Sequence, residues 1–183
     1  IYIDQGHNPV NPNAGSEGNG FREQDLVYTI GQMTAASLRS YGFDVRLSRP
    51  SPTTQLGTSN TTSLQARVND ANSWGADYFI SLHTNASDVT SASGSEAFVY
   101  RRDSDAEYLA ENILTQLNYA TGLQNRGVMV RPGLYVLKKT RMPATLVELG
   151  FITNPVDAEL MAYSPGLFAA GVSNGVLAYF GML

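Results

Sequence analysis

The sequence contains no cysteine among its 183 residues. Disulfide bonds, thiolate zinc sites and cysteine nucleophiles are therefore all excluded. No run of about 18 apolar residues occurs, so we expect no insertion into a membrane. The chain begins at Ile1 without an initiator methionine or a signal peptide, and we interpret it as a mature or excised part of a longer protein.

Positive charge is also scarce. The chain has 12 Lys and Arg residues against 16 Asp and Glu, which gives a net charge of -4, and no basic stripe is present. This balance argues against nucleic acid as a partner. Hydrophobic residues make up 43% of the chain and charged residues 15%, which is typical of a folded globular protein. We expect one domain, residues 1–183, with a single core, and a monomer.

Strand-like and helical segments alternate along the chain. Strands are expected at residues 1–4, 43–47, 78–82, 95–100, 133–137 and 143–149. Helices are expected at about 21–40, 63–74, 103–120 and 165–179, with a short helix opened by Asn154 and Pro155. The alternation predicts an α/β fold, in which a roughly six-stranded, mostly parallel twisted sheet carries helices on both faces.

Histidine occurs only twice, and both histidines follow a predicted strand. His7 comes after the first strand, and His83 comes directly after the apolar segment 78–82. Glu148 lies in the last residues of the predicted strand 143–149, and Glu23 lies in the first turn of the helix that leaves the first strand. In an open α/β sheet, ligands collect beyond the carboxyl ends of the strands. We therefore expect these four side chains to converge at one edge.

Two neutral imidazoles and one carboxylate form a ligand set for catalytic zinc, with a fourth position left for water. Zinc lowers the pKa of such a water to about 7, and a second carboxylate beside it can act as a base. We interpret His7, Glu23 and His83 as the ligands of one Zn2+ ion and Glu148 as the base.

Other interpretations of these residues remain open from the pattern alone. Glu23 and Glu148 could exchange roles, and Glu23 could serve only to favour its helix dipole. Glu17 and Glu96 are rival carboxylates. Glu17 ranks lower because it lies in a flexible loop, and Glu96 ranks lower because it lies at the amino end of its strand. Arg67, on the helix 63–74, is expected to be structural.

Four segments carry a family resemblance: Ile3-Asp4-Gln5-Gly6-His7, the helix start at Glu23, residues 79–86 (FISLHTNA) and residues 143–154 (PATLVELGFITN). They resemble the zinc-dependent N-acetylmuramoyl-L-alanine amidases of autolysins, spore-cortex enzymes and phage lysins. The resemblance covers essentially the whole chain in order, and the last segment is the most specific. One departure is that the family usually has Pro before Gly-His and Gly-Gly after it, where this chain has Gln5 and Asn8-Pro9.

The resemblance implies hydrolysis of the amide between N-acetylmuramic acid and the L-alanine of the peptidoglycan stem, at the cell wall or outside the cell. It also implies that the zinc ligands are His7, Glu23 and His83, and that Glu148 is the catalytic residue. The candidates for substrate binding are Asn85, Arg126 and Lys138. The alternatives are a zinc peptidase that acts on stem peptides and a catalytically inactive module that binds the cell wall.

Overall fold

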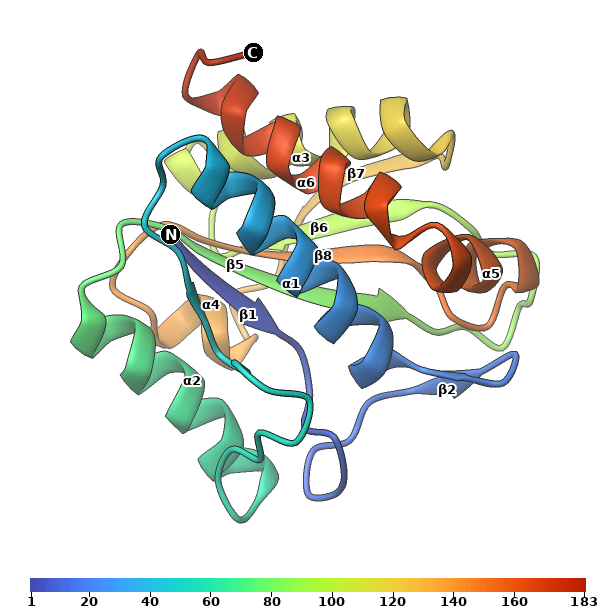
Figure 1. The fold of residues 1–183 in the computed structure, drawn as a ribbon, viewed down its shortest axis with the longest axis horizontal. Coiled ribbons are helices and arrows are strands. Elements are labelled where there is room, and N and C mark those ends of the chain that lie inside the picture. Colours follow the sequence, from blue (N-terminus) through green and yellow to red (C-terminus); the bar gives the residue numbers. More distant parts are fainter.

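A six-stranded sheet forms the centre of the computed structural model, which describes all of residues 1–183 (Figure 1). Its spatial order is β4-β1-β5-β8-β6-β7. The strands are β1 (Tyr2–Gln5), β4 (Arg46–Leu47), β5 (Phe79–Asn85), β6 (Ser95–Val99), β7 (Asn125–Val130) and β8 (Ala144–Phe151). The first four strands in the spatial order run parallel, whereas β6 runs antiparallel to β8 and parallel to β7. The expected mostly parallel sheet is confirmed.

Helices cover both faces of this sheet. One face carries α1 (Glu23–Ser40), α3 (Asp105–Thr121) and α6 (Pro165–Tyr179); the other carries α2 (Asn60–Trp74) and α4 (Tyr135–Lys139); α5 (Pro155–Tyr163) follows β8 (Figure 1). Successive residues of a strand point to opposite faces. Accordingly, Ile80 and Leu82 join the core under α1, α3 and α6, whereas Phe79 packs with Val68 and Ala71 of α2.

One expected strand is not observed, and one observed strand was not expected. The predicted strand 133–137 is mostly the short helix α4, in which Val136 and Leu137 are buried and Lys138 and Lys139 are exposed. A short apolar run alone does not distinguish a strand from a helix. Strand β7 was not expected, because this edge strand is largely exposed and has no apolar alternation. A separate two-stranded ribbon pairs β2 (Glu17–Gly18) with β3 (Phe21–Arg22).

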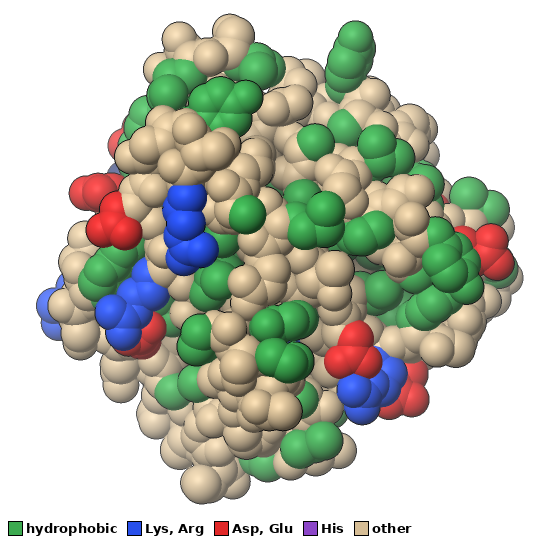
Figure 2. Space-filling model, in the orientation of Figure 1, with side chains coloured by type: hydrophobic (Ala, Val, Ile, Leu, Met, Phe, Trp, Pro, Cys, Tyr) green, Lys and Arg blue, Asp and Glu red, His purple; other side chains and the backbone are tan.

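Positive charge is sparse on one face of the molecule (Figure 2). On the face shown in Figure 2, basic side chains are few, and several lie beside acidic ones. Arg22 pairs with Asp25, and Arg46 pairs with Asp70. None of the helices combines the length and the apolar character that crossing a lipid bilayer requires.

Candidate active site

The two histidines and two glutamates reach the same edge of the sheet from four elements. His7 follows β1, and Glu23 is the first residue of α1. His83 lies within β5, because the strand continues two residues beyond it instead of ending before it as expected. Glu148 lies in β8 and is the register partner of His83 on the neighbouring parallel strand. These four side chains lie close together because β1, β5 and β8 are neighbouring parallel strands.

One carboxylate oxygen lies between both imidazoles. Oε1 of Glu23 is 3.1 Å from Nε2 of His7 and 3.0 Å from Nδ1 of His83. The two imidazole ring centroids are 4.8 Å apart, with an angle of 79° between the ring planes. Glu23 also accepts two backbone hydrogen bonds, from Thr84 N to Oε1 at 3.0 Å and from Ser16 N to Oε2 at 2.9 Å. These contacts fix the orientation of the buried carboxylate.

The environment makes Glu23 a permanent anion. Its burial opposes ionisation, but the hydrogen bonds to His7 and His83 and the electrostatic interaction with them lower the pKa of the carboxyl well below its usual value. A buried ionised carboxylate is stable only when it is paired or bound to a metal.

Glu148 has the opposite character. It is half-buried, and its Oε2 atom is shielded from solvent without a hydrogen-bond partner. Burial, together with the negative charges of Glu23 and Glu96, raises the pKa of Glu148 to about 8. One glutamate of the site is thus held ionised, while the other can gain and lose a proton near neutral pH.

The donor set fits a divalent metal ion. One ligand atom each from His7, Glu23 and His83 lies within 4.8 Å of the others. His7 presents Nε2 and His83 presents Nδ1 to the same oxygen of Glu23, so each imidazole offers one ring nitrogen to a common point. Two imidazoles and a carboxylate without any thiolate match the ligands of catalytic zinc sites, which keep an open position.

Glu96 is not part of the metal cluster, as expected, but the reason expected for this, its place at the amino end of the strand, is wrong. Because β6 runs antiparallel to β8, the amino end of β6 lies at the carboxyl edge of β5 and β8, and Glu96 faces Glu148 across the strand pair. Its carboxylate accepts from Asn85 Nδ2 at 2.8 Å and from Arg126 Nε at 2.8 Å. The guanidinium of Arg126 also lies over the ring of Phe151. The presence of a carboxylate in an otherwise apolar strand could have indicated that Glu96 has polar partners near the site, because a buried carboxylate needs them.

The other candidates lie outside the cluster of His7, Glu23 and His83. Lys138 lines a cavity of about 410 Å³ beside Tyr100 and Pro143, where β6 ends and β8 begins, which is the opposite edge of the sheet. Glu17, the second rival carboxylate, is exposed on β2. Among the predicted substrate contacts, only Asn85 and Arg126 are connected to the neighbourhood of Glu148, through Glu96.

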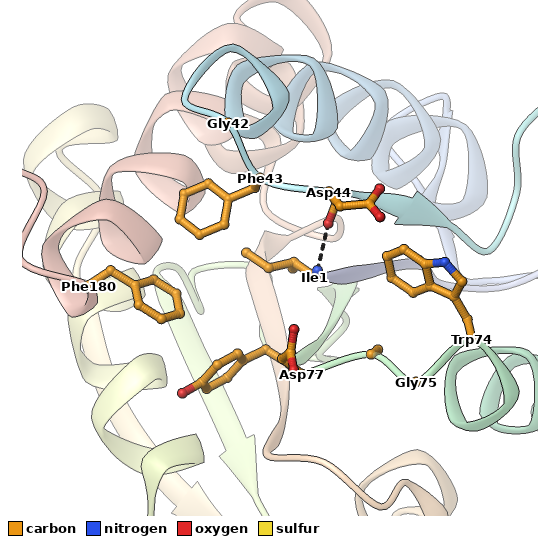
Figure 3. Close-up of a pocket in the computed structure, with 10 residues that line it drawn as sticks. Ile1, Gly42, Phe43, Asp44, Trp74, Gly75, Asp77 and Phe180 are labelled. Atoms are coloured by element: carbon orange, nitrogen blue, oxygen red, sulfur yellow. Dashed lines mark hydrogen bonds between the residues drawn. The ribbon is translucent and has the colours of Figure 1, made fainter.

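Two further cavities differ in their relation to this site. A small one of about 140 Å³ borders His7 and His83, and Leu64, Tyr135 and Leu146 line its apolar side. The cavity of about 500 Å³ in Figure 3 lies at the amino edge of the sheet. Aromatic rings and Asp44 and Asp77 surround it, and it holds no histidine, so it is not the metal site.

The loop of residues 86–94, which joins β5 to β6, runs along the same edge as the metal ligands. Its first part is fixed by Ser87 N, which donates to Thr153 Oγ1 at 3.0 Å. Its last residue is fixed by Gly94 N, which donates to Asp157 Oδ2 at 3.0 Å. Between these two ties, Val89 is largely exposed. Both ties use residues that follow β8, so the loop and the Glu148 strand form one rim.

Comparison with known proteins gives consistent relatives. Residues 1–178 match the family model described as N-acetylmuramoyl-L-alanine amidase. The chain is 35% identical to the amidase LytC of Bacillus subtilis over 98% of the chain and 35% of LytC. It is 34% identical to the amidase CwlM of Bacillus licheniformis over 100% of the chain and 69% of CwlM. The chain thus spans about a third of LytC and about two thirds of CwlM.

Solved structures agree with these relatives. The amidase AmiC2 of Nostoc punctiforme superposes with a TM-score of 0.84 at 30% identity, covering 98% of this chain and 96% of that one. An N-acetylmuramoyl-L-alanine amidase of Clostridium difficile 630 gives a TM-score of 0.84 at 29% identity, covering 98% and 95%. Since the family model spans nearly the whole chain and the fold agrees throughout, the chain belongs to the N-acetylmuramoyl-L-alanine amidase family of hydrolases.

Proposed function

We propose that residues 1–183 act as a single catalytic domain that hydrolyses the amide between N-acetylmuramic acid and L-alanine in peptidoglycan. One zinc ion would be held by His7, Glu23 and His83, with Glu148 as the proton carrier. The observation that carries this proposal is the convergence of those three donor groups beside Glu148 on the adjacent strand. Because related amidases include one named as a cell wall amidase, the proposed place of action is the cell wall.

Each group of the site would have a separate role in the reaction. A zinc ion at this site would supply Lewis acidity, which lowers the pKa of water to about 7 and polarises a carbonyl. Glu23 is kept ionised and is oriented by the N–H groups of Ser16 and Thr84, so the ligand set does not reorganise during the reaction. His7 and His83 would each contribute one ring nitrogen as a ligand.

Glu148 would move the proton. Its carboxylate accepts a proton from the attacking water as the new C–O bond forms, and then delivers it to the alanine nitrogen as the C–N bond breaks. A group serves both steps best when its pKa lies near the working pH. The pKa of about 8 in the protein alone would be lowered towards neutrality by a nearby cation. The unpartnered Oε2 atom supplies the acceptor.

The substitutions Glu148→Gln and His83→Ala test these roles. We expect Glu148→Gln to reduce the lysis of purified cell walls by about 100-fold or more, because it removes the proton carrier and preserves the shape of the side chain. We expect the variant to retain zinc in elemental analysis, whereas His83→Ala should lose the metal. Glu159→Gln, on the exposed surface of α5, is the matched control. Full lysis by Glu148→Gln would contradict the assignment.

Mass spectrometry of the released fragments identifies the bond that is cut. The proposal requires stem peptides of full length that begin with a free L-alanine amine. Shortened peptides would instead show that the same zinc chemistry acts as a stem peptidase. Binding to walls without any release of fragments would show an inactive wall-binding module.

A further inference from the structure

His7 is the only metal ligand that lies outside a helix or strand. Glu23 begins α1 and His83 lies within β5, so regular hydrogen bonding fixes both backbones. His7 lies in the bend after β1, and its φ angle is 64°. This left-handed conformation is uncommon for residues other than glycine. Its Nδ1 atom forms no hydrogen bond. Apart from the contact of Nε2 with Glu23 Oε1, the position of the His7 ring therefore depends on what holds its backbone.

The guanidinium of Arg67 contacts that backbone. Arg67 projects from α2 and is 1% exposed. Its Nη1 atom donates to Asp4 Oδ1 and to Gln5 O, each at 2.6 Å. Its Nη2 atom donates to the carbonyl oxygen of His7. The guanidinium of Arg67 thus connects the end of β1 with the backbone carbonyl of His7.

The position of Arg67 is itself fixed relative to His83. Asp4 accepts from Arg67 with one carboxylate oxygen, and its other oxygen, Oδ2, accepts from Ser81 Oγ at 2.7 Å. Ser81 lies two residues before His83 on the same strand. The Asp4 side chain is buried, so this pair is shielded from water. The buried pair therefore connects the backbone of His7 with the strand that carries His83.

We propose that Arg67 is a positioning residue of the metal site, which sets metal affinity by fixing the backbone of His7 without contacting the ion. This inference rests on the proposed metal site. It revises the purely structural role expected of Arg67 from the sequence. The groups that hold metal ligands in place commonly affect metal affinity nearly as strongly as the ligands.

The substitution Arg67→Lys separates positioning from folding. Lysine keeps a positive charge opposite Asp4, but its single nitrogen cannot reproduce the fork that reaches both Asp4 and the His7 carbonyl. We expect zinc affinity, measured by competition with a chelating dye, to fall by about 10- to 100-fold. The visible absorption bands of the Co2+-loaded protein should also change, because these bands report ligand geometry. The thermal unfolding of the metal-free variant should remain cooperative, which shows that the variant is folded.

Arg46→Lys is the matched control. Arg46 of β4 also connects α2 to the sheet, because its guanidinium donates two hydrogen bonds to Asp70, at 2.7 and 3.0 Å. It lies far from the metal site, because its register partner in the sheet is Tyr2, at the amino end of β1. This variant should bind zinc like the wild type. Wild-type zinc affinity and an unchanged cobalt spectrum in Arg67→Lys would overturn the proposal.

A second variant covers the case in which Arg67→Lys does not fold. The double substitution Asp4→Asn with Arg67→Met removes both buried charges together, which proteins tolerate better than the loss of one partner. The proposal requires this folded variant to bind zinc more weakly than the wild type, and equal affinity would overturn it. If the wild-type protein itself binds no zinc, the proposed function fails instead, and the two failures are distinguishable.

Discussion

Two glycines create the space in which the ligand side chains meet. A Cβ atom at Gly6 would lie 2.5 Å from Cε1 of His83 and 2.7 Å from the carbonyl oxygen of Leu82. A Cβ atom at Gly15 would lie 2.8 Å from Oε2 of Glu23 and 3.0 Å from Cδ2 of His7. Neither glycine has a positive φ angle, which is the usual reason why a position requires glycine. Both are therefore required by close approach to the site.

We expect Gly6→Ala to displace His83 and to reduce both zinc content and hydrolysis. The added methyl group cannot be accommodated, because one of its neighbours is the backbone of β5. Zinc per protein chain and the initial rate of wall lysis are the measurements. Gly133→Ala is the control, since its Cβ would meet nothing within 4 Å. Full zinc occupancy in Gly6→Ala would contradict this account of the packing.

At the scale of elements, the direction of β6 explains what the sequence revealed and what it did not. His7, Glu23, His83 and Glu148 were predictable together, because parallel strands end at a common edge. Glu96 was expected at the edge of the sheet opposite the site, because the alternation of buried and exposed residues does not show in which direction a strand runs. Parallel strands need a crossover of about a dozen residues or more, and the loop 86–94 contains no helix. The short loop between β5 and β6 could therefore have predicted that β6 runs antiparallel to its neighbour.

The remaining differences also have physical causes. The segment 133–137 combines apolar residues with an exposed Lys138-Lys139 pair, and these suit one turn of helix as well as a short strand. The roles of Arg67 and Gly6 could not be inferred from composition, because both depend on contacts between residues far apart in the chain. By contrast, the bounds of α6 agree with the predicted helix 165–179, since Pro165 favours a helix start.

The contact between α6 and α3 also depends on close approach. A Cβ atom at Gly175 would lie 2.4 Å from Cα of Ile113, and one at Gly171 would lie 2.8 Å from Cα of Leu117. We expect Gly175→Ala to lower the free energy of unfolding by about 1–3 kcal/mol, because the helices must move apart. Urea unfolding is the measurement, and the activity of the folded fraction should be unchanged.

Gly166→Ala on the same helix is the control for this prediction. Its Cβ would meet only the flexible end of Met33, at 3.3 Å. Alanine has the higher helix propensity, so this variant should be neutral or slightly more stable. Equal effects of the two substitutions would show that helix separation is not the cause.

At the scale of the whole molecule, Glu148 links the site to the stability of the fold. Its pKa is raised from the usual value of 4.5 to about 8 by burial and by the charges of Glu23 and Glu96. Between these two pH values the folded chain retains a proton that the unfolded chain has released. Folding stability therefore falls as pH rises through this window, and Glu148 contributes no pH dependence below about pH 4.

We expect Glu148→Gln to flatten this pH dependence in the metal-free protein. The difference in unfolding free energy between the variant and the wild type should change by an amount on the order of 4 kcal/mol between pH 4 and pH 8, in favour of the variant at high pH. Urea unfolding in the presence of a chelator measures it. Parallel stability curves for the two proteins would contradict the raised pKa.

The rim formed by the loop 86–94 has a consequence for how such an enzyme can diversify. Its two ends are tied to Thr153 and Asp157, whereas Val89 between them is exposed. Extra residues grafted at that tip would lie at the edge of the sheet that carries the proposed metal ligands and Glu148. The connection after β6, by contrast, emerges at the opposite edge of the sheet, away from the proposed site. Redesign of wall specificity should therefore start from the loop that precedes the reversed strand.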